Sequence, residues 1–562
     1  SGTPFSDADL VHLRDLKELE SLGQLPVFDD QFTPAGLCRL VMYLPEYKEY
    51  FPFLRKVFLR TGEFTTSSSP FDNETLTASR AAVYLKENVS PDELSADDRL
   101  QMATLLLAGE YGVELEYDSD GRVVGVTFSG IPLSSDHLQL LSMLPQLSSV
   151  SMNYSREDDS LVETSDLSEP GMDLTGLDLP GMPVLPGEGK SEEVTAFQQS
   201  DLARLARISG LKDLHLDGDL FTDDVIEQIV KIKGLHSLHL STSQITGASL
   251  RQLEQLSDLR EISFFGCEEL TDESLLAIAA MPKIRSVSIG DCKRTSSKGL
   301  AGILALPVLE TLALYDSAEN LDEQALEKLS TSHLKSVILV GELDDSICTR
   351  LATISSLEEI AIVSTVFRGE QLEQLKSLAR LVNLKLEGCT SLSVEGLRQI
   401  NQLTGLRKLF LNHSEVSDEE VLQLTDLKQL EFLDLRVNQS LTDTGLAALA
   451  AMPKLQELSL FYCPGIRGEG LDHLAMLSEL RILDIGNNKI RDVGLQRLSN
   501  NRSIWELKLS LNQEFTDAGA IYLGRMKQLK KLELGFTTQL SLDLILKLDA
   551  ALPGCEITPS QR

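Results

Sequence analysis

One pattern of aliphatic residues recurs along most of this 562-residue chain. A segment of the form LxxLxL, in which L is leucine or a similar residue, begins at fourteen positions separated by steps of 23 to 25 residues. The starts are Leu211, Leu235, Leu259, Ile284, Leu309, Leu334, Leu357, Leu381, Leu406, Leu430, Leu455, Leu480, Ile504 and Leu529. A fixed period of this length is typical of repeat arrays, in which each unit buries its apolar face only against its neighbours. The pattern therefore predicts one long solenoid, although the length alone would allow about three to five domains.

Two more units lie upstream of this run. Val123-Val126-Phe128 and Leu147-Val150-Met152 follow the same pattern, and their starts are 24 residues apart. The next start, Leu211, lies 64 residues further on. That distance is one repeat step plus about 40 inserted residues, and insertions of this kind lie on loops at one edge of a solenoid. We therefore expect sixteen units with an insertion after the second.

Each unit is expected to form a strand, a turn, a helix and a second turn. Side chains alternate along a strand, so the fourth and sixth positions of LxxLxL point into the core, and the third, fifth and seventh point away from it. A pair such as Thr442-Asp443 then begins the helix, where the hydroxyl can cap the helix and the carboxylate favours its positive end. Pro453 ends the helix that follows. The fold class expected is an α/β solenoid of parallel strands and helices.

A small residue occupies the ninth position of most units and can hydrogen-bond the turn backbone, which would otherwise be buried unpaired. This polar slot holds Ser243, Cys267, Cys292, Ser317, Thr365, Cys389, Ser414, Asn438, Cys463, Asn488, Asn512 and Thr537. Four of the seven cysteines thus have a structural explanation. Of the others, Cys38, Cys348 and Cys555, we expect packed thiols rather than nucleophiles.

These residues resemble the leucine-rich repeat family. Leu441-Thr-Asp-Thr-Gly-Leu446 and Leu270-Thr-Asp-Glu-Ser-Leu275 are similar to the bacterial LTDxGL repeats, and the cysteine slots resemble the cysteine-containing subclass. The resemblance covers about residues 111–557 and is specific for fold rather than function. It implies a curved horseshoe, with parallel strands on a concave face that binds partners and helices on the convex face. The array departs from the pattern at Glu342, which stands in the polar slot, and at the insertion.

The chain is expected to divide into five parts. Residues 1–62 look like degenerate repeats, 63–110 like a helical junction or cap, and 111–152 like the first two units of the main array, entered through a hairpin turned at Asp118–Gly121. Residues 153–197 form an acidic insertion containing proline and glycine, and 198–562 form the continuous array. Because the sequence opens partway through a repeat and without methionine, we expect a processed or truncated N-terminus.

The insertion has two interpretations. Its acidic, proline-containing composition is typical of a surface loop. Its two similar apolar segments, Pro170–Leu174 and Pro180–Leu185, would also allow it to dock a partner or to cover the concave face. Calcium binding by its acidic run is not indicated, because the DxDxDG spacing is absent.

The strand positions that point away from the core supply the candidate binding residues. In the middle of the array they are apolar, and an exposed apolar row containing aromatic anchors is typical of protein interfaces. The candidates are Phe265, Tyr315, Ile338, Val340, Val363, Phe410 and Phe461. The alternatives are that these residues are ordinary scattered surface residues or are covered by the insertion.

The sequence contains few features typical of an enzyme. His215 and His239 should stack beside Asp217, but no third metal ligand is evident, so neither a metal nor a cofactor is expected. There is no GxxxxGK[ST], HExxH or GxSxG motif. Because 85 acidic residues face 51 basic ones, the net charge of -34 disfavours nucleic acid and anionic lipid. No apolar run reaches the length of a membrane-spanning helix.

The sequence therefore predicts a non-enzymatic scaffold that binds a protein or peptide on its concave strand face. Two alternatives remain open. The chain could be a structural protein that associates with itself, or it could be the targeting arm of a larger protein whose catalytic part is absent from this sequence.

Overall fold

The computed structural model describes residues 94–558 except 111–112, 132, 134, 155–198, 209, 538–539 and, apart from Ala325 and Lys328, 317–332. It also describes scattered positions between 71 and 89. The predicted N-terminal repeats at 1–62 and nearly all of the insertion lie outside these residues. The chain divides into two compact units, Ser1–Leu259 and Arg260–Arg562. The five-part division expected from the sequence stays a prediction.

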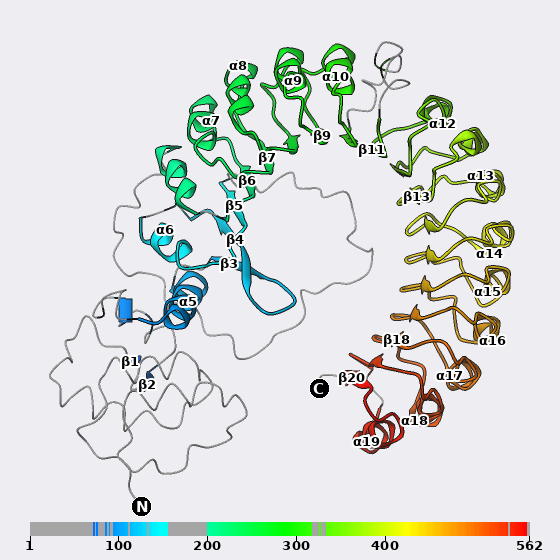
Figure 1. Cartoon of the computed structure of the whole chain (residues 1–562). Helices are drawn as coiled ribbons and strands as arrows, with labels where there is room; N and C mark the ends of the chain where they lie inside the picture. The colour runs from blue at the N-terminus through cyan, green and yellow to red at the C-terminus, as the bar shows by residue number, and fades with distance from the viewer. Residues whose placement is uncertain are drawn as a thin grey trace, which may run out of the picture. The chain divides into compact units, whose positions relative to one another are not determined.

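The first unit carries the start of the main array (Figure 1). Its strands are β1 (Phe71–Asp72), β2 (Thr75–Leu76), β3 (Glu114–Tyr117), β4 (Val123–Ser129), β5 (Ser149–Asn153), β6 (Asp213–Asp217) and β7 (Ser237–Ser241). Its helices are α5 (Ala96–Leu105), α6 (Ser135–Leu141), α7 (Asp223–Ile229) and α8 (Gly247–Leu250), with the π turn η3 (Leu106–Glu110) and the 3₁₀ helices η4 (Gln199–Arg207) and η5 (Arg251–Gln255).

The register of this unit follows the repeat. Strand β3 pairs antiparallel with β4, which gives the expected hairpin, and β4 to β7 are parallel. Val150 pairs with Leu214, so β5 and β6 are neighbours although about 60 residues of chain separate them, as expected when an insertion leaves and re-enters a solenoid at one turn. In the region expected to form a helical junction or cap, Thr75 and Leu76 form a short strand that pairs antiparallel with β1.

The second unit is a ladder of parallel strands. They are β8 (Glu261–Phe265), β9 (Ser286–Gly290), β10 (Thr311–Tyr315), β11 (Ser336–Val340), β12 (Glu359–Val363), β13 (Asn383–Leu386), β14 (Lys408–Phe410), β15 (Phe432–Asp434), β16 (Glu457–Ser459), β17 (Ile482–Asp484), β18 (Glu506–Lys508), β19 (Lys531–Glu533) and β20 (Glu556–Thr558). In the last strand, Ile557 pairs with Leu532, which is the fourth residue of its repeat. The register therefore aligns Gly554 with Leu529, so the first position of the last repeat is a glycine and not a leucine. The sequence pattern therefore did not reveal it.

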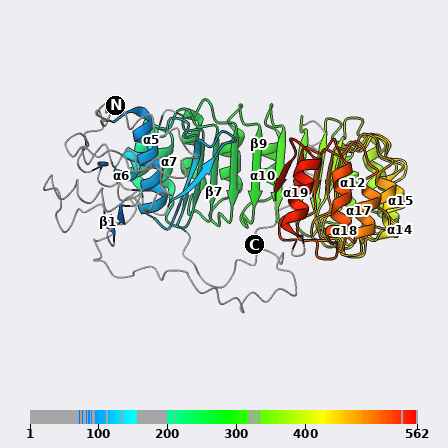
Figure 2. The ribbon, with the colours of Figure 1, turned by 90° about the horizontal axis from the view of Figure 1, so that it is seen from below.

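One helix or helical turn follows most strands of this unit. These are α9 (Asp272–Ala279), α10 (Ser297–Leu304), α12 (Ser346–Leu351), η7 (Leu372–Ser377), α13 (Val394–Ile400), α14 (Asp418–Val421), α15 (Leu446–Leu449), α16 (Leu471–Leu474), α17 (Asp492–Leu498), α18 (Asp517–Ala520), η8 (Ile521–Arg525) and α19 (Leu542–Ala551). Within this unit the strands line the inner side of the arc and the helices the outer side (Figures 1 and 2). The predicted α/β solenoid is confirmed.

The core lies between the strands and the helices of each unit. Leu384 and Leu386 of β13 are fully buried, and so are Leu397 and Ile400 of the helix α13 that follows. A fully buried side chain of this size contributes about 1.5–3 kcal/mol. The repeated leucines therefore stabilise one continuous apolar layer, which each repeat shares with the next.

The polar slot works as the sequence predicted. Asn438 is fully buried; its Oδ1 accepts from the N–H groups of Ser414 and Val416, and its Nδ2 donates to the carbonyls of Leu411 and Leu435. The assignment of Thr365 was wrong. Thr365 is exposed, and the buried Ser364 occupies the slot instead, accepting from the N–H of Leu343 at 3.0 Å.

The aspartate at the start of many of the helices has a second role, which the sequence did not reveal. Asp418 caps the next repeat: it accepts from the N–H of Thr442 at 2.8 Å, from the Thr442 hydroxyl and from the N–H of Gly445 at 3.0 Å. Bonds of this kind satisfy helix N–H groups that have no partner within their own helix. The same inter-repeat bond is made by Asp223, Asp272, Asp345, Asp443, Asp492 and Asp517. We call this set the aspartate ladder.

The ladder explains the glycine of the Thr-Asp-x-Gly motif. A Cβ added to Gly445 would lie 2.7 Å from Oδ1 of Asp418, and one added to Gly299 would lie 2.6 Å from Oδ1 of Asp272. These separations are shorter than Cβ contacts in real structures. Glycine therefore leaves the space in which the carboxylate of the preceding repeat caps the helix.

The eighth position of the repeat has a left-handed backbone. Gly218, Gly266, Gly341 and Gly388 fill it in four repeats, and glycine adopts a positive φ without steric penalty. Other repeats place larger residues there with φ between 45° and 64°: Thr242, Asp291, Asp316, His413, Val437, Tyr462, Asn487, Leu511 and Phe536. The backbone geometry of the repeat thus holds even where the residue does not favour it.

Replacing Leu511 by asparagine is expected to raise the free energy of unfolding by about 0.5–1 kcal/mol, because asparagine tolerates a left-handed backbone better than leucine. Leu511 is 37% exposed, so the substitution also removes some buried apolar surface, and the control below, at a residue that is 42% exposed, matches this loss. Denaturant unfolding followed through the single tryptophan, Trp505, measures the change. The control is Ile521→Asn, at an exposed position with a right-handed backbone (φ −57°). A gain in stability in the control would contradict the explanation.

Candidate partner-binding surface

The seven candidate residues all lie on the strand face of the second unit that points away from the core, and all are half-buried. Phe265 ends β8, Tyr315 ends β10, Val340 ends β11 and Val363 ends β12, each at the seventh position of its repeat. Ile338 takes the fifth position of β11. Phe410 and Phe461 lie further along the array, on or next to β14 and β16.

Five of the candidates form one continuous surface, which we call the apolar row: Phe265, Tyr315, Ile338, Val340 and Val363. The strand register pairs Tyr315 with Val340 and Val340 with Val363. Ile338 lies between two buried alanines, Ala313 and Ala361, on the neighbouring strands. The short alanine side chains leave Ile338 and the seventh-position residues as the raised apolar groups of this face.

Gly290, which has no side chain, allows the rings of Phe265 and Tyr315 in the apolar row to touch. Gly290 stands between Phe265 and Tyr315 in the register of β8, β9 and β10. A Cβ on Gly290 would lie 2.6 Å from Cδ1 of Phe265, so only glycine lets that ring extend across β9. The Phe265 and Tyr315 rings meet with centroids 5.0 Å apart and planes inclined at 58°. This tilted arrangement is favoured between aromatic rings.

The other two candidates are separated from the apolar row by charged residues. On β13, Nζ of Lys385 lies 2.6 Å from a carboxylate oxygen of Glu359 and 5.4 Å from the centroid of the Phe410 ring. Phe410 packs on Phe432, with ring centroids 4.6 Å apart. The structure therefore brings five of the predicted residues together and leaves Phe410 and Phe461 outside that group.

An ion pair between a buried aspartate and an exposed arginine lies on the same face between Phe410 and Phe461. Asp434 is 1% exposed and accepts from Nε of Arg436 at 3.0 and 2.9 Å and from its Nη2 at 2.7 Å. These bonds raise the pKa of the Arg436 guanidinium. Two repeats further on, burial raises the pKa of Asp484. The sequence shows an aspartate and an arginine two positions apart, but the burial of Asp434 depends on the neighbouring strands.

The histidine pair lies in the first unit. His215 and His239 pair in register on β6 and β7, and their rings stack 4.0 Å apart at 14°. Burial and the neighbouring His215 lower the pKa of His239 to about 4. Burial also lowers the pKa of His215, although Asp213 and Glu116 oppose the shift. The Oγ of Ser237 lies 2.7 Å from Nε2 of His239, so the neutral ring is held by a hydrogen bond.

The lowered pKa of His239 predicts a stability that depends on pH. The folded pKa of about 4 lies below the ordinary value of 6.5, so between these values the unfolded chain binds more protons. The stabilisation is present above pH 6.5 and is lost as the pH falls toward 4. His239→Gln should therefore reduce the fall in thermal midpoint between about pH 7 and pH 5, measured by circular dichroism. His236→Gln, at an exposed position, serves as control, and an equal reduction in both variants would contradict the assignment.

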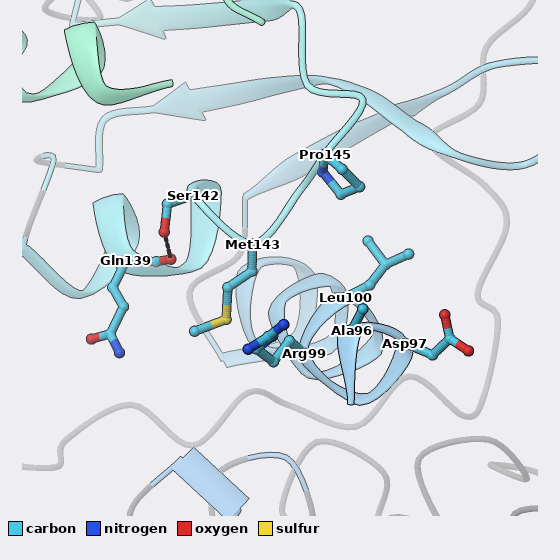
Figure 3. A pocket seen from close by; sticks show the side chains of 8 residues that line it. All are labelled: Ala96, Asp97, Arg99, Leu100, Gln139, Ser142, Met143 and Pro145. Atoms are coloured by element: carbon cyan, nitrogen blue, oxygen red, sulfur yellow. Dashed lines mark hydrogen bonds between the residues drawn. The ribbon is translucent and has the colours of Figure 1, made fainter. Parts of the chain in front are cut away.

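A surface hollow of about 520 Å³ lies in the first unit, between α5 and the end of α6 with the residues that follow it (Figure 3). It is lined by Ala96, Asp97, Arg99, Leu100, Gln139, Ser142, Met143 and Pro145. The Ser142 hydroxyl donates to the carbonyl of Gln139, and the lining contains neither histidine nor cysteine. These eight side chains therefore do not provide a nucleophile with an adjacent base.

The described cysteines form no disulfide bonds, and all are buried. Burial raises the pKa of Cys348, Cys389 and Cys463 to about 12, so these thiols stay protonated at neutral pH. Cys463 donates to the carbonyl of Leu435 at 3.2 Å, as the slot requires. Within the described part of the chain, no group of three or more His, Cys, Asp or Glu side chains could hold a metal ion, and no helix is long and apolar enough to cross a membrane.

Comparison with known proteins identifies the repeat. The family model described as "Leucine Rich repeat" matches residues 428–450, 478–499 and 500–524, which contain strands β15, β17 and β18. The chain contains leucine-rich repeats. The bacterial subtype of repeat expected from the LTDxGL motif stays a prediction.

Parts of the chain are similar to several known proteins. A Trypanosoma equiperdum protein, whose name describes a regulator of adenylate cyclase, is 28% identical over 169 residues, which is 30% of this chain and 26% of that protein. A leucine-rich repeat protein of Leptospira interrogans matches at 17% identity and a TM-score of 0.36, covering 76% of this chain and 92% of that one. The Rad7–Elc1 complex of yeast contains a chain with 19% identity and a TM-score of 0.39, covering 64% and 86% respectively. At these TM-scores the structural likenesses carry no argument about function.

Proposed function

We propose that the chain is a non-enzymatic scaffold that binds a protein or peptide on the strand face of its second unit. The observation that carries this proposal is the apolar row. Its five residues lie on a face that none of the described helices of the same repeats covers, because those helices pack on the opposite side of the strands (Figure 1). Apolar side chains gathered on such a face are typical of contact surfaces.

The composition of the row supports this proposal. Interface centres are enriched in aromatic side chains and poor in charged ones. The row has Phe265 and Tyr315 at one end and three aliphatic residues at the other. Charged pairs such as Lys385–Glu359 adjoin it, as polar groups adjoin the rim of an interface. The repeat family supports the same role, since solenoid proteins use extended concave surfaces for binding.

Site-specific crosslinking tests this proposal. A photoreactive amino acid is placed at Tyr315, at Val363 and, as a control on the helical side, at Met476, which is 76% exposed after α16. The proposal predicts that one polypeptide is crosslinked from Tyr315 and from Val363 but not from Met476. Crosslinks from Met476 alone would place the binding surface on the helices and overturn the proposal.

A further inference from the structure

Acidic residues stand along the strand ends next to the aromatic part of the apolar row. Asp291 directly follows Gly290, and Asp316 directly follows Tyr315. Both are exposed, and both occupy the left-handed eighth position, with φ of 45° and 48°. Glu342, in the next repeat, is also exposed. We call these three residues the acidic edge.

The backbone bonds fix how the two aspartates are arranged. The N–H of Asp291 donates to the carbonyl of Tyr315 at 3.2 Å, and the N–H of Asp316 donates to the carbonyl of Val340 at 2.8 Å. The two residues therefore stand at the ends of adjacent strands, which lie about 4.8 Å apart. Gly341 leaves room for the second carboxylate, because a Cβ there would lie 3.0 Å from Oδ1 of Asp316.

The neighbouring cation does not neutralise this edge. Nζ of Lys293 lies 3.9 Å from a carboxylate oxygen of Asp291, and the two side chains are 72% and 63% exposed. An exposed pair at this distance is weak. The charge of the acidic edge is therefore available to a ligand, and the net charge of -34 adds to the negative potential around it.

Two tilted aromatic rings beside two carboxylates form a surface that suits a cationic side chain. The face of an aromatic ring attracts lysine and arginine, and carboxylates accept charge-assisted hydrogen bonds from both. A partner carrying acidic groups at the same place would face repulsion from Asp291 and Asp316. The aliphatic end of the row, Ile338, Val340 and Val363, requires apolar side chains in the same ligand.

From this arrangement we infer that the partner segment is a basic and apolar peptide, with lysine or arginine at the acidic edge and apolar side chains on Ile338, Val340 and Val363. This inference rests on the proposed function and specifies the chemistry of the partner at that same surface. The carboxylates set the sign of the charge that is accepted, while the apolar row supplies the contact area.

Three fluorescein-labelled synthetic peptides of equal length test the inference by fluorescence anisotropy. The first has Leu-Phe-Leu flanked by lysine and arginine, the second has glutamate in place of every basic residue, and the third keeps the basic residues but replaces Leu-Phe-Leu with serine. The protein variants are the double substitution Asp291→Asn with Asp316→Asn, the single substitution Tyr315→Ser, and a charge-matched control. The control combines Asp224→Asn with Glu227→Gln on α7, where both side chains are exposed.

The first peptide should bind wild-type protein at least about tenfold more tightly than the other two, and added salt should weaken its binding. The double aspartate variant and Tyr315→Ser should each weaken it by about tenfold, whereas the control should leave it unchanged. If the acidic peptide binds as tightly and is lost in Tyr315→Ser, the charge inference is overturned while the proposed function stands. If Tyr315→Ser alters the binding of no peptide, the proposed function fails together with the inference.

Discussion

Replacing Asn438 by alanine is expected to lower the free energy of unfolding of the second unit by about 3–5 kcal/mol, because several buried backbone groups lose their hydrogen bonds at about 1–3 kcal/mol each. The N–H groups of Ser414 and Val416 and the carbonyl of Leu411 lose the Asn438 side chain as partner. The carbonyl of Leu435 keeps the Cys463 thiol as a donor. Urea unfolding, followed through the fluorescence of Trp505, measures the loss within this unit.

Two further variants control this prediction. Gln439→Ala removes a neighbouring exposed amide and should change stability by less than about 0.5 kcal/mol. Asn438→Cys should fall between alanine and wild type, because a thiol can donate to a carbonyl, as Cys463 does, but is only a weak acceptor for the two N–H groups. A loss below about 1 kcal/mol for Asn438→Ala would contradict the prediction, because it would show that water or backbone movement supplies new hydrogen-bond partners for the buried backbone groups that Asn438 had bonded.

Replacing Asp418 by alanine is expected to lower the free energy of unfolding by about 2–4 kcal/mol, because a carboxylate that caps the next repeat is lost with three charge-assisted bonds. The groups left without it are the N–H and the hydroxyl of Thr442 and the N–H of Gly445. Hydrogen exchange should show the same loss locally, as faster exchange of the Thr442 and Gly445 amides.

The next residue along α14 provides a matched control for the aspartate ladder. Glu419 carries the same charge in the first turn of the same helix but is exposed. Glu419→Ala should therefore change stability by less than about 0.5–1 kcal/mol, which is the effect of a charge near the helix dipole. Asp418→Asn should retain part of the cap through its remaining oxygen. Equal losses for Asp418→Ala and Glu419→Ala would mean that the charge, and not the inter-repeat bonds, stabilises the fold.

The sequence predicted those features that depend on one repeat and its period. The spacing of the leucines identified the strands, and the register of Val150 with Leu214 agrees with the expected insertion. The burial of Asn438 and Cys463 followed from their shared slot. These features were predictable because a strand's alternation and a repeated polar position are local properties.

Features that join two repeats were harder to predict. The bond from Asp418 to Thr442 links residues 24 positions apart, and the only signal for it was that a glycine recurs two residues after the next Thr-Asp pair. In the repeat that starts at Leu357, Ser364 replaced Thr365 in the slot because that repeat lacks the left-handed residue at its eighth position. On the candidate surface, the apolar strand positions were predictable. The contact of Phe265 with Tyr315 across Gly290 depends on three strands at once.

The central claim is that the strand face of the second unit binds a protein partner. The most direct test measures the dissociation constant of the partner captured by crosslinking for two double variants. Tyr315→Ser with Val363→Ser removes side chains from the apolar row, while Leu422→Ser with Met476→Ser removes exposed side chains on the helical side. We predict that the first pair raises Kd by at least about tenfold with an unchanged Trp505 unfolding midpoint, and that the second pair leaves Kd unchanged. An unchanged Kd for the first pair, together with a raised Kd for the second, would contradict the claim.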